Sequence, residues 1–226
     1  MLKDGERLDD LGVNGWAVIQ SRDDWRFSAD TVYLARFASV RRGDRILDLG
    51  MGDGALSLLL LAREETAVCT GIEIRPAAVD RALRSIRHNR LEDRCGVIRG
   101  DIADHRHLIS PASYTLAAAN PPYARPVQDG QRFAEARCMP YEDIALWCRA
   151  ASWVLENRGR FCVVYPCGAM QQMLSAMEAA DLSLKRLEIV RSASGCGIFL
   201  AEGIKAARPG GTSVTVADVS GEAAGK

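Results

Sequence analysis

The sequence predicts an α/β domain built on a doubly wound sheet of seven strands, mostly parallel, with an antiparallel closing strand. Short apolar runs alternate with helical patterns along the chain, as in successive strand–helix units. A glycine-rich turn joins the first such strand to a helix, and a very short loop makes the final strand antiparallel. With 226 residues, 48% of them hydrophobic, the chain is long enough to bury the core of one such domain.

The expected elements follow one another in order along the chain. Strands are expected at residues 45–49, 68–74, 96–99, 114–119, 160–165, 184–190 and 198–204. Helices are expected at residues 56–62, 75–89, 141–155 and 171–180. An earlier helix is expected after Ser28 or Asp30, either of which is a good N-cap. Pro76 suits the first position of its helix.

The two ends of the chain are expected to lie outside the main domain. We divide the chain into an N-terminal extension (1–24), a main domain (25–210) and a C-terminal tail (211–226). Within the extension, residues 15–20 predict a short hairpin or an edge strand. A short strand is expected in the tail at residues 213–216.

The composition argues against several classes of protein. Lys plus Arg and Asp plus Glu both total 29, so no excess of basic charge indicates a nucleic-acid partner. Arg81, Arg84, Arg87 and Arg90 recur near helical spacing, as on a solvated helix face. No apolar run approaches the ~20 residues that span a bilayer, and the N-terminus lacks an apolar signal core. The seven cysteines never form C-x-x-C and indicate reduced thiols, so we expect a cytoplasmic protein.

The glycine-rich turn carries an acid directly before it. Asp48 precedes Gly50, Gly52 and Gly54, with Met51 between the first two glycines. Glycines are expected where a ligand approaches the backbone and where φ is positive. The spacing differs from the G-x-G-x-x-G of dinucleotide enzymes. It resembles the S-adenosylmethionine (SAM) loop of Rossmann-like class I methyltransferases, in which the acid faces the cationic end of the cofactor. We assign these five residues to a SAM site; a purely structural glycine turn is the alternative.

Two more acids follow the next two strands. Glu73 lies about 20 residues beyond the glycine turn, the spacing at which a carboxylate accepts both hydroxyls of a ribose. Asp101 follows the third strand, where the corresponding acid of class I methyltransferases receives the adenine amino group. We assign Ile74 and Ile102, their apolar neighbours, to the same cofactor site. Asp101 as a helix N-cap is the competing interpretation.

The fourth strand ends in the tetrapeptide Asn120-Pro121-Pro122-Tyr123. The Asn120 side-chain oxygen and a proline carbonyl would accept both hydrogens of an exocyclic amino group, and Tyr123 would stack on its base. Such hydrogen bonds return electron density to adenine N6, a poor nucleophile, which then attacks a positioned methyl donor in line. We assign these four residues to catalysis and Asn120 also to the cofactor site. A proline-rich turn without catalytic duty is the alternative.

Further segments complete a family pattern. They are Glu6-Arg7-Leu8-Asp9-Asp10-Leu11, Ile19-Gln20, Phe27-Ser28 with Asp30, and Glu202-Gly203-Ile204-Lys205 with Arg208-Pro209-Gly210. Together with the glycine turn and the tetrapeptide, they resemble the bacterial methyltransferases that include the tRNA-valine adenine-N6 enzyme. The resemblance implies SAM as cofactor, RNA as partner with an anticodon-loop adenosine of tRNA as target, and Phe27 in the cofactor site.

Two departures from the family pattern leave other functions open. Met51 replaces a small polar residue and would change how the adenosine is seated, and Arg137-Cys138-Met139 replaces an Arg-His-Glu stretch. A protein without catalysis that binds SAM is therefore one alternative. Another is glutamine N5-methylation of a protein, since release-factor methyltransferases share the tetrapeptide. Those enzymes carry a longer N-terminal module than the residues before Trp25 provide.

No metal is expected in this protein. His105 and His107 are close in sequence, but no third ligand lies near them, and a polar loop is the simpler interpretation. The pattern makes no prediction of the oligomeric state.

Overall fold

A computed structural model describes residues 2–23, 27–122, 141–192 and 195–218. The strands of its main sheet are β3 (Arg45–Leu49), β4 (Val68–Glu73), β5 (Cys95–Arg99), β6 (Tyr114–Ala119), β7 (Leu155–Pro166), β8 (Leu182–Ser192), β9 (Gly195–Lys205) and β10 (Ser213–Asp218). Their order across the described part of the sheet is β10-β8-β9-β7-β6-β3-β4-β5. Within that part, β9 is antiparallel to both its neighbours and every other pairing is parallel. The predicted fold class is therefore confirmed.

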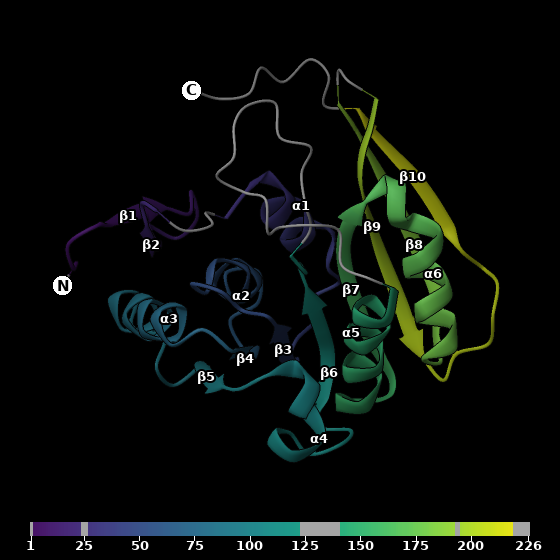
Figure 1. Cartoon of the computed structure of the whole chain (residues 1–226), viewed down its shortest axis with the longest axis horizontal. Helices are drawn as coiled ribbons and strands as arrows, with labels where there is room; N and C mark the ends of the chain where they lie inside the picture. The colour runs from purple at the N-terminus through teal and green to yellow at the C-terminus, as the bar shows by residue number, and fades with distance from the viewer. Residues whose placement is uncertain (1, 24–26, 123–140, 193–194, 219–226) are drawn as a thin grey trace.

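Helices cover both faces of the sheet (Figure 1). α1 (Ala29–Phe37), α2 (Ala55–Leu61) and α3 (Pro76–His88) lie on one side, and α5 (Tyr141–Val154) and α6 (Met170–Ala179) on the other. Short helical turns, η1 (Ile102–Asp104), α4 (His105–Leu108) and η2 (Cys167–Ala169), complete the connections. Along β3, Ile46 packs against the first helix group and Leu47 and Leu49 against the second. Burial on both faces explains why apolar residues occupy the successive positions 46 and 47 of this strand instead of alternate ones.

The carboxyl-terminal half of the sheet is larger than predicted. The strand expected at 213–216 is present, and as β10 it pairs in parallel with β8, so the described sheet has eight strands, not seven. β8 and β9 both extend into the loop expected at residues 191–195, of which 193–194 lie outside the described residues. Paired strand ends satisfy backbone hydrogen bonds that a loop would leave to water, which favours the longer hairpin.

The segment predicted as a short hairpin or an edge strand, residues 15–20, supplies the second strand of a longer hairpin that packs on helix α3. β1 (Glu6–Asp10) and β2 (Ala17–Ser21) pair in antiparallel register. One side chain of α3 and the side chain of its C-cap residue bind the β2 backbone. Ser85 Oγ accepts from Ile19 N, and Asn89 Oδ1 accepts from Ala17 N, both at 2.9 Å. The hairpin is therefore fixed against the main domain by specific hydrogen bonds.

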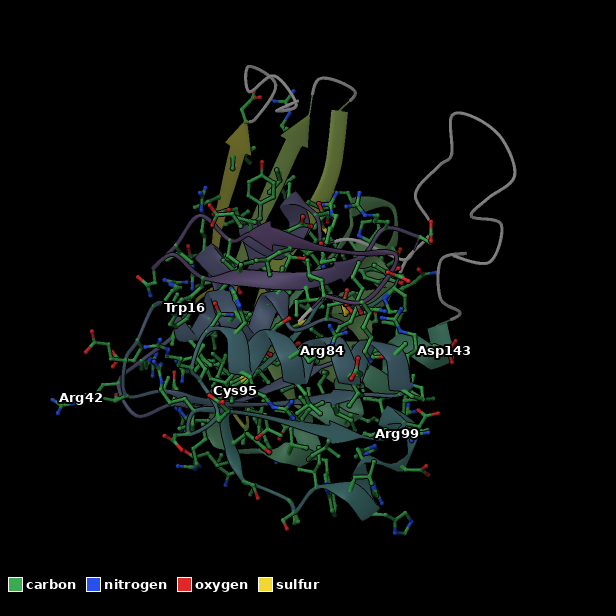
Figure 2. All side chains as sticks on the ribbon, turned by 90° about the vertical axis from the view of Figure 1, so that its left-hand side faces the viewer. Trp16, Arg42, Arg84, Cys95, Arg99 and Asp143 are labelled. Atoms are coloured by element: carbon green, nitrogen blue, oxygen red, sulfur yellow. The ribbon has the colours of Figure 1, made fainter. Side chains whose placement is uncertain are left out.

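Two arginines of α3 do not form the solvated face that their spacing predicts. Arg84 lies beneath the hairpin (Figure 2) and pairs with Glu6 at 2.5 Å. Arg81 is buried and pairs with Asp53 of the glycine turn at 2.8 Å. Both guanidinium groups join separate segments of the chain, which the helical spacing alone does not reveal.

Among the cysteines whose side chains the structure describes, Cys69, Cys95, Cys148, Cys162 and Cys167 are free thiols, as expected. In the described residues, no helix is long and apolar enough to cross a membrane.

A buried ion pair joins the amino ends of three strands. Arg160 Nη2 of β7 lies 2.5 Å from Asp44 Oδ1, just before β3, and both side chains are almost fully buried. Asp44 also accepts hydrogen bonds from Thr115 of β6 and from the Arg41 backbone, at 2.7 and 2.6 Å. Arg160 in turn donates to the Ser39 carbonyl. These contacts satisfy both charges in a site that water does not reach.

We expect Asp44→Ala to lower the free energy of unfolding by about 3–5 kcal/mol, because it leaves the Arg160 guanidinium buried without a counter-ion. The exposed pair Arg45–Glu156, at 2.8 Å, supplies the control. Glu156→Ala should cost at most about 1 kcal/mol. Urea unfolding of both variants measures the two losses of free energy of unfolding. Equal losses would show that the buried pair stabilises the protein no more than the exposed pair.

Candidate active site

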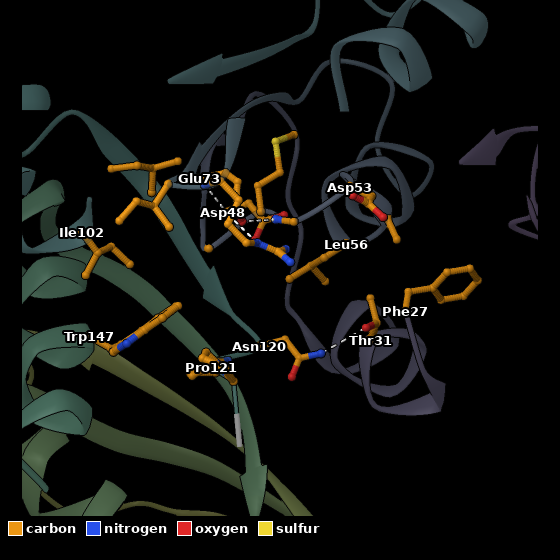
Figure 3. A pocket seen from close by; sticks show the side chains of 18 of the residues that line it. Phe27, Thr31, Asp48, Asp53, Leu56, Glu73, Ile102, Asn120, Pro121 and Trp147 are labelled. Atoms are coloured by element: carbon orange, nitrogen blue, oxygen red, sulfur yellow. Dashed lines mark hydrogen bonds and ion pairs between the residues drawn. The ribbon is translucent and has the colours of Figure 1, made fainter. Parts of the chain in front are cut away.

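A cavity of about 690 Å³ opens at the carboxyl ends of β3, β4, β5 and β6 (Figure 3). Its volume is typical of a site for a nucleoside-sized ligand. Helices α1 and α5 contribute further walls. The predicted residues that line it are Phe27, Asp48, Gly50, Met51, Gly52, Glu73, Ile74, Asp101, Ile102, Asn120, Pro121 and Pro122. The structure thus brings residues from all four predicted strand ends together.

Two predicted residues are not part of this described wall. Gly54 has a φ of +97° and is the N-cap of α2, beside the lining residues. Tyr123 lies outside the described residues, as do Arg137, Cys138 and Met139.

The glycine turn leaves room for a ligand because two of its positions forbid a side chain. Gly50 and Gly52 have φ values of +68° and +59°, in the left-handed region that favours glycine. A Cβ on Gly50 would also lie 2.5 Å from the ring of Trp147, which packs directly on the turn. Both glycines line the cavity, and the ring of Trp147 occupies the space that a side chain at Gly50 would need.

The side chain of Met51 fits because the neighbouring strand has a glycine, without a side chain, beside it. Its side chain is buried, and a Cβ on Gly71 of β4 would lie 2.1 Å from the Met51 sulfur. The larger side chain at this position is therefore matched by the absence of one at position 71. This packing shows how the fold accommodates the departure at Met51.

Asp48 is a buried carboxylate at the wall of the cavity. Ser57 Oγ donates to its Oδ2 at 2.6 Å. The pKa of Asp48 is raised to about 7, chiefly by burial; the Ser57 hydrogen bond opposes the shift, and the nearby Glu73 charge adds to it. A cationic ligand group would favour the ionised form and so bind more tightly when Asp48 is charged.

Glu73 is held rigidly at the end of β4. Its Oε2 accepts from Gly52 N at 2.8 Å, which ties it to the glycine turn. Its Oε1 accepts from the backbone N and the Nε of Arg75, at 2.9 and 3.0 Å. The carboxylate is thus fixed where a ribose above the turn would meet it.

Asp101 serves as a cap and also lines the cavity. Its side chain accepts from Ala103 N at 2.8 Å and begins η1, as the competing interpretation expected. It remains exposed at the cavity, beside the buried Ile102. Capping fixes the carboxylate without removing it from the site.

Asn120 presents its amide between β6 and helix α1. Its Nδ2 donates to Thr31 Oγ1 at 3.0 Å, as Figure 3 shows. Pro121 is buried and Pro122 is exposed, and both line the cavity. The start of the tetrapeptide therefore lies in the same cavity as the glycine turn and Glu73.

Sequence reasoning missed several lining residues, because most carry no motif. They include Gln20, Thr31, Leu56, Arg75, Asp143 and Trp147. With its amide oriented to satisfy both neighbours, Gln20 donates to Asp9 at 2.8 Å and accepts from Phe27 N at 3.0 Å. Gln20 belongs to the Ile19-Gln20 segment of the family pattern, just before the Phe27 segment, and this was the signal that could have placed it in the site. No comparable signal marks Trp147 apart from its position on the helix after the tetrapeptide.

Within the described residues, no three His, Cys, Asp or Glu side chains lie close enough to hold a metal ion. His105 is buried in place of the expected polar loop. Its Nδ1 lies 2.8 Å from the Ile102 carbonyl, and its ring meets Trp153 edge-on.

Comparisons with known proteins identify the family of this chain. Residues 41–203 match a family model described as a methyltransferase domain. A tRNA1(Val) (adenine(37)-N6)-methyltransferase from Dickeya chrysanthemi (strain Ech1591) is 32% identical over 184 residues, 78% of this chain and 71% of that protein. The chain belongs to the tRNA1(Val) adenine-N6-methyltransferase family. Another family member, from Pectobacterium carotovorum, is 32% identical over 163 residues, and the match spans 65% of its length, just under two thirds.

Solved structures show the same fold at lower identity. A predicted O-methyltransferase from Agrobacterium tumefaciens superimposes with a TM-score of 0.64 at 19% identity, over 84% of this chain and 85% of that one. A geranyl diphosphate methyltransferase in complex with SAM gives 0.59 at 13% identity, over 78% and 84%. At such identities the likeness concerns the fold alone.

The cavity of this tRNA1(Val) adenine-N6-methyltransferase family member fits SAM as its cofactor. Gly50 and Gly52 present backbone at the wall of the cavity, and the buried Asp48 suits the cationic end of SAM. Glu73 suits the ribose, and Ile74, with 56% of its surface exposed, offers an apolar contact for the adenine. The lining residues thus fit SAM in chemical character.

We expect the affinity for SAM to increase roughly tenfold between pH 6 and pH 8, because Asp48 ionises near pH 7 and then attracts the cation. Asp48→Asn should weaken binding and remove this pH dependence. Calorimetric titrations at several pH values test both statements. An unchanged slope in the variant would exclude Asp48 as the titrating group.

The same carboxylate should make the unliganded protein less stable at higher pH. Its folded pKa of about 7 exceeds the ordinary value of 3.8, so between these values the folded state holds a proton that the unfolded state has lost. Its contribution to stability therefore falls as pH rises from about 4 to about 7, and is lost above that range. Asp48→Asn should unfold at a higher temperature than the wild type at pH 8, with the difference shrinking towards pH 4.

We expect Gly71→Ala to destabilise the protein by about 1–3 kcal/mol, because the new methyl group overlaps Met51. Combining it with Met51→Ala should recover part of this loss, giving a coupling energy of about 0.5 kcal/mol or more. Gly96→Ala on β5 is the control, since nothing lies within 4 Å of its Cβ position. Additive losses in a denaturant-based double-mutant cycle would contradict the pairing.

Proposed function

We propose that this chain transfers a methyl group from SAM to the N6 amino group of an adenine in tRNA, with an adenosine of the anticodon loop as target. The observation that carries this proposal is the location of Asn120-Pro121-Pro122 in one cavity with the glycine turn and Glu73. The name of the family supports the choice of substrate.

The residues of the chain activate the nucleophile by hydrogen bonding. SAM would supply an electrophilic methyl group when bound: as N6 bonds to this methyl group, the methyl–sulfur bond breaks, its electron pair stays on the neutral thioether that leaves, and one N6 proton is lost to solvent. The Asn120 side-chain oxygen and a proline carbonyl each accept one N6 hydrogen, which draws the nitrogen towards tetrahedral geometry and returns its lone pair. Asn120 follows the strand next to the glycine turn, so the amine and the cofactor are held at neighbouring positions.

The depth of the cavity favours a target in a single strand. Pro121, Asp48 and Trp147 are buried lining residues, so an adenine must leave its stack to reach Asn120. Extruding a base costs least in an unpaired loop, where stacking is already incomplete. An anticodon-loop adenosine meets this requirement.

We expect the wild-type chain to methylate adenine in tRNA and Asn120→Ala to lower kcat by about 10²–10³-fold, because an acceptor that acts in the transition state is lost. The dissociation constant for SAM should stay within a few-fold. Nucleoside mass spectrometry after incubation with labelled SAM gives the rate, and calorimetry gives the affinity. Asn157→Ala, an exposed position on β7, is the matched control.

The same assay separates the competing functions. Label on a glutamine of a release factor, with none on tRNA, would favour the protein substrate. SAM binding without transfer to either would favour a module that binds the cofactor without catalysis. Strong turnover by Asn120→Ala would refute the role of the tetrapeptide.

A further inference from the structure

We propose that Thr31 is a positioning residue that sets the orientation of the Asn120 amide for the methyl transfer. This inference rests on the proposed function, because it concerns the group that accepts hydrogens from the target amine. Thr31 belongs to α1, 89 positions before Asn120 in the sequence, and carries no motif that sequence analysis singled out.

The contact between the two side chains is partly buried at the wall of the cavity. Asn120 Nδ2 donates to Thr31 Oγ1 at 3.0 Å, and Thr31 is 5% exposed. Figure 3 shows the amide nitrogen directed at Thr31 and the oxygen directed away from it. Both residues line the cavity, so the hydrogen bond lies where the substrate amine is expected.

The orientation of the amide decides whether Asn120 can accept a hydrogen bond from the target amine. An asparagine amide has a donor end and an acceptor end of nearly equal size, so shape alone does not select between them. With the nitrogen engaged by Thr31, the oxygen is left to accept from an amino group. The reversed amide would present its own N–H groups to the N–H groups of adenine N6, which is repulsive and removes the acceptor.

The hydroxyl is suited to the acceptor role. A threonine hydroxyl in a helix commonly donates to a carbonyl one turn earlier, which leaves its lone pairs for an incoming N–H group. A valine of the same shape offers no such lone pair.

Helix α1 is held in place near both of its ends. The Arg63 side chain donates to the Ala35, Arg36 and Ala38 carbonyls at the carboxyl end. Before the amino end, Gln20 accepts from Phe27 N. Thr31 is therefore a fixed reference for the amide and not a mobile neighbour.

The test compares Thr31→Val with Thr31→Ser. Valine removes the hydroxyl at nearly constant volume, and serine keeps the hydroxyl but removes the methyl group. We expect kcat to fall about tenfold in Thr31→Val with the KM for SAM unchanged, and Thr31→Ser to recover most of the rate. Thr70→Val on β4, outside the cavity, is the matched control and should keep the wild-type rate. Equal losses in the serine and valine variants would show a packing role and overturn the proposal.

A second measurement does not depend on activity. The chain has asparagines only at positions 14, 89, 120 and 157, so selective ¹⁵N labelling of asparagine gives a readable set of side-chain amide signals. We expect the Asn120 signal, assigned by its loss in Asn120→Ala, to move in Thr31→Val but not in Thr70→Val. An unmoved signal overturns the contact. If the wild type methylates nothing, the proposed function fails, while the amide signal still reports on the contact.

Discussion

The parallel pairing of β3 with β4 and β6 is the constraint on which the site depends. Leu49, the last residue of β3, lies opposite Ile72 on one side and Ala119 on the other. The next residues of the three strands are therefore Gly50, Glu73 and Asn120, which leave the sheet side by side. A shift of one residue in either pairing would carry one of these groups away from the others, because successive side chains point to opposite faces. The apolar cores on both faces of the sheet fix the register and so fix the site.

The remaining walls of the cavity come from segments outside the main sheet. The N-terminal hairpin carries Gln20 to the cavity, and its contacts with α3 and with the Phe27 backbone hold it there. Helix α1 adds Thr31, and α5 places Trp147 on the glycine turn. The binding surface thus unites residues from widely separated parts of the chain, which depend on the same packed core for their relative positions.

Features that follow from local chemistry could be predicted from the sequence. Strands, their order along the chain and the acids and glycines at their ends each leave a pattern within a few residues, as at Asp48 and Glu73. Features that follow from packing between distant segments could not. The Thr31–Asn120 contact and the burial of Arg81 against Asp53 depend on which helix faces which loop. The strand at 213–216 was expected, but its pairing with β8 was not, because the alternation of Val214 and Val216 does not indicate which strand lies beside it.

The packing of Met51 against Gly71 also bears on how such a chain changes over generations. Two positions 20 residues apart share one volume, so neither is free to vary without regard to the other. A lineage that acquires a long side chain in the turn must already lack one on the adjacent strand. Reversal has to proceed in the opposite order, by shortening the turn residue first. The order of substitutions is thus constrained at a point where each residue, taken alone, looks replaceable.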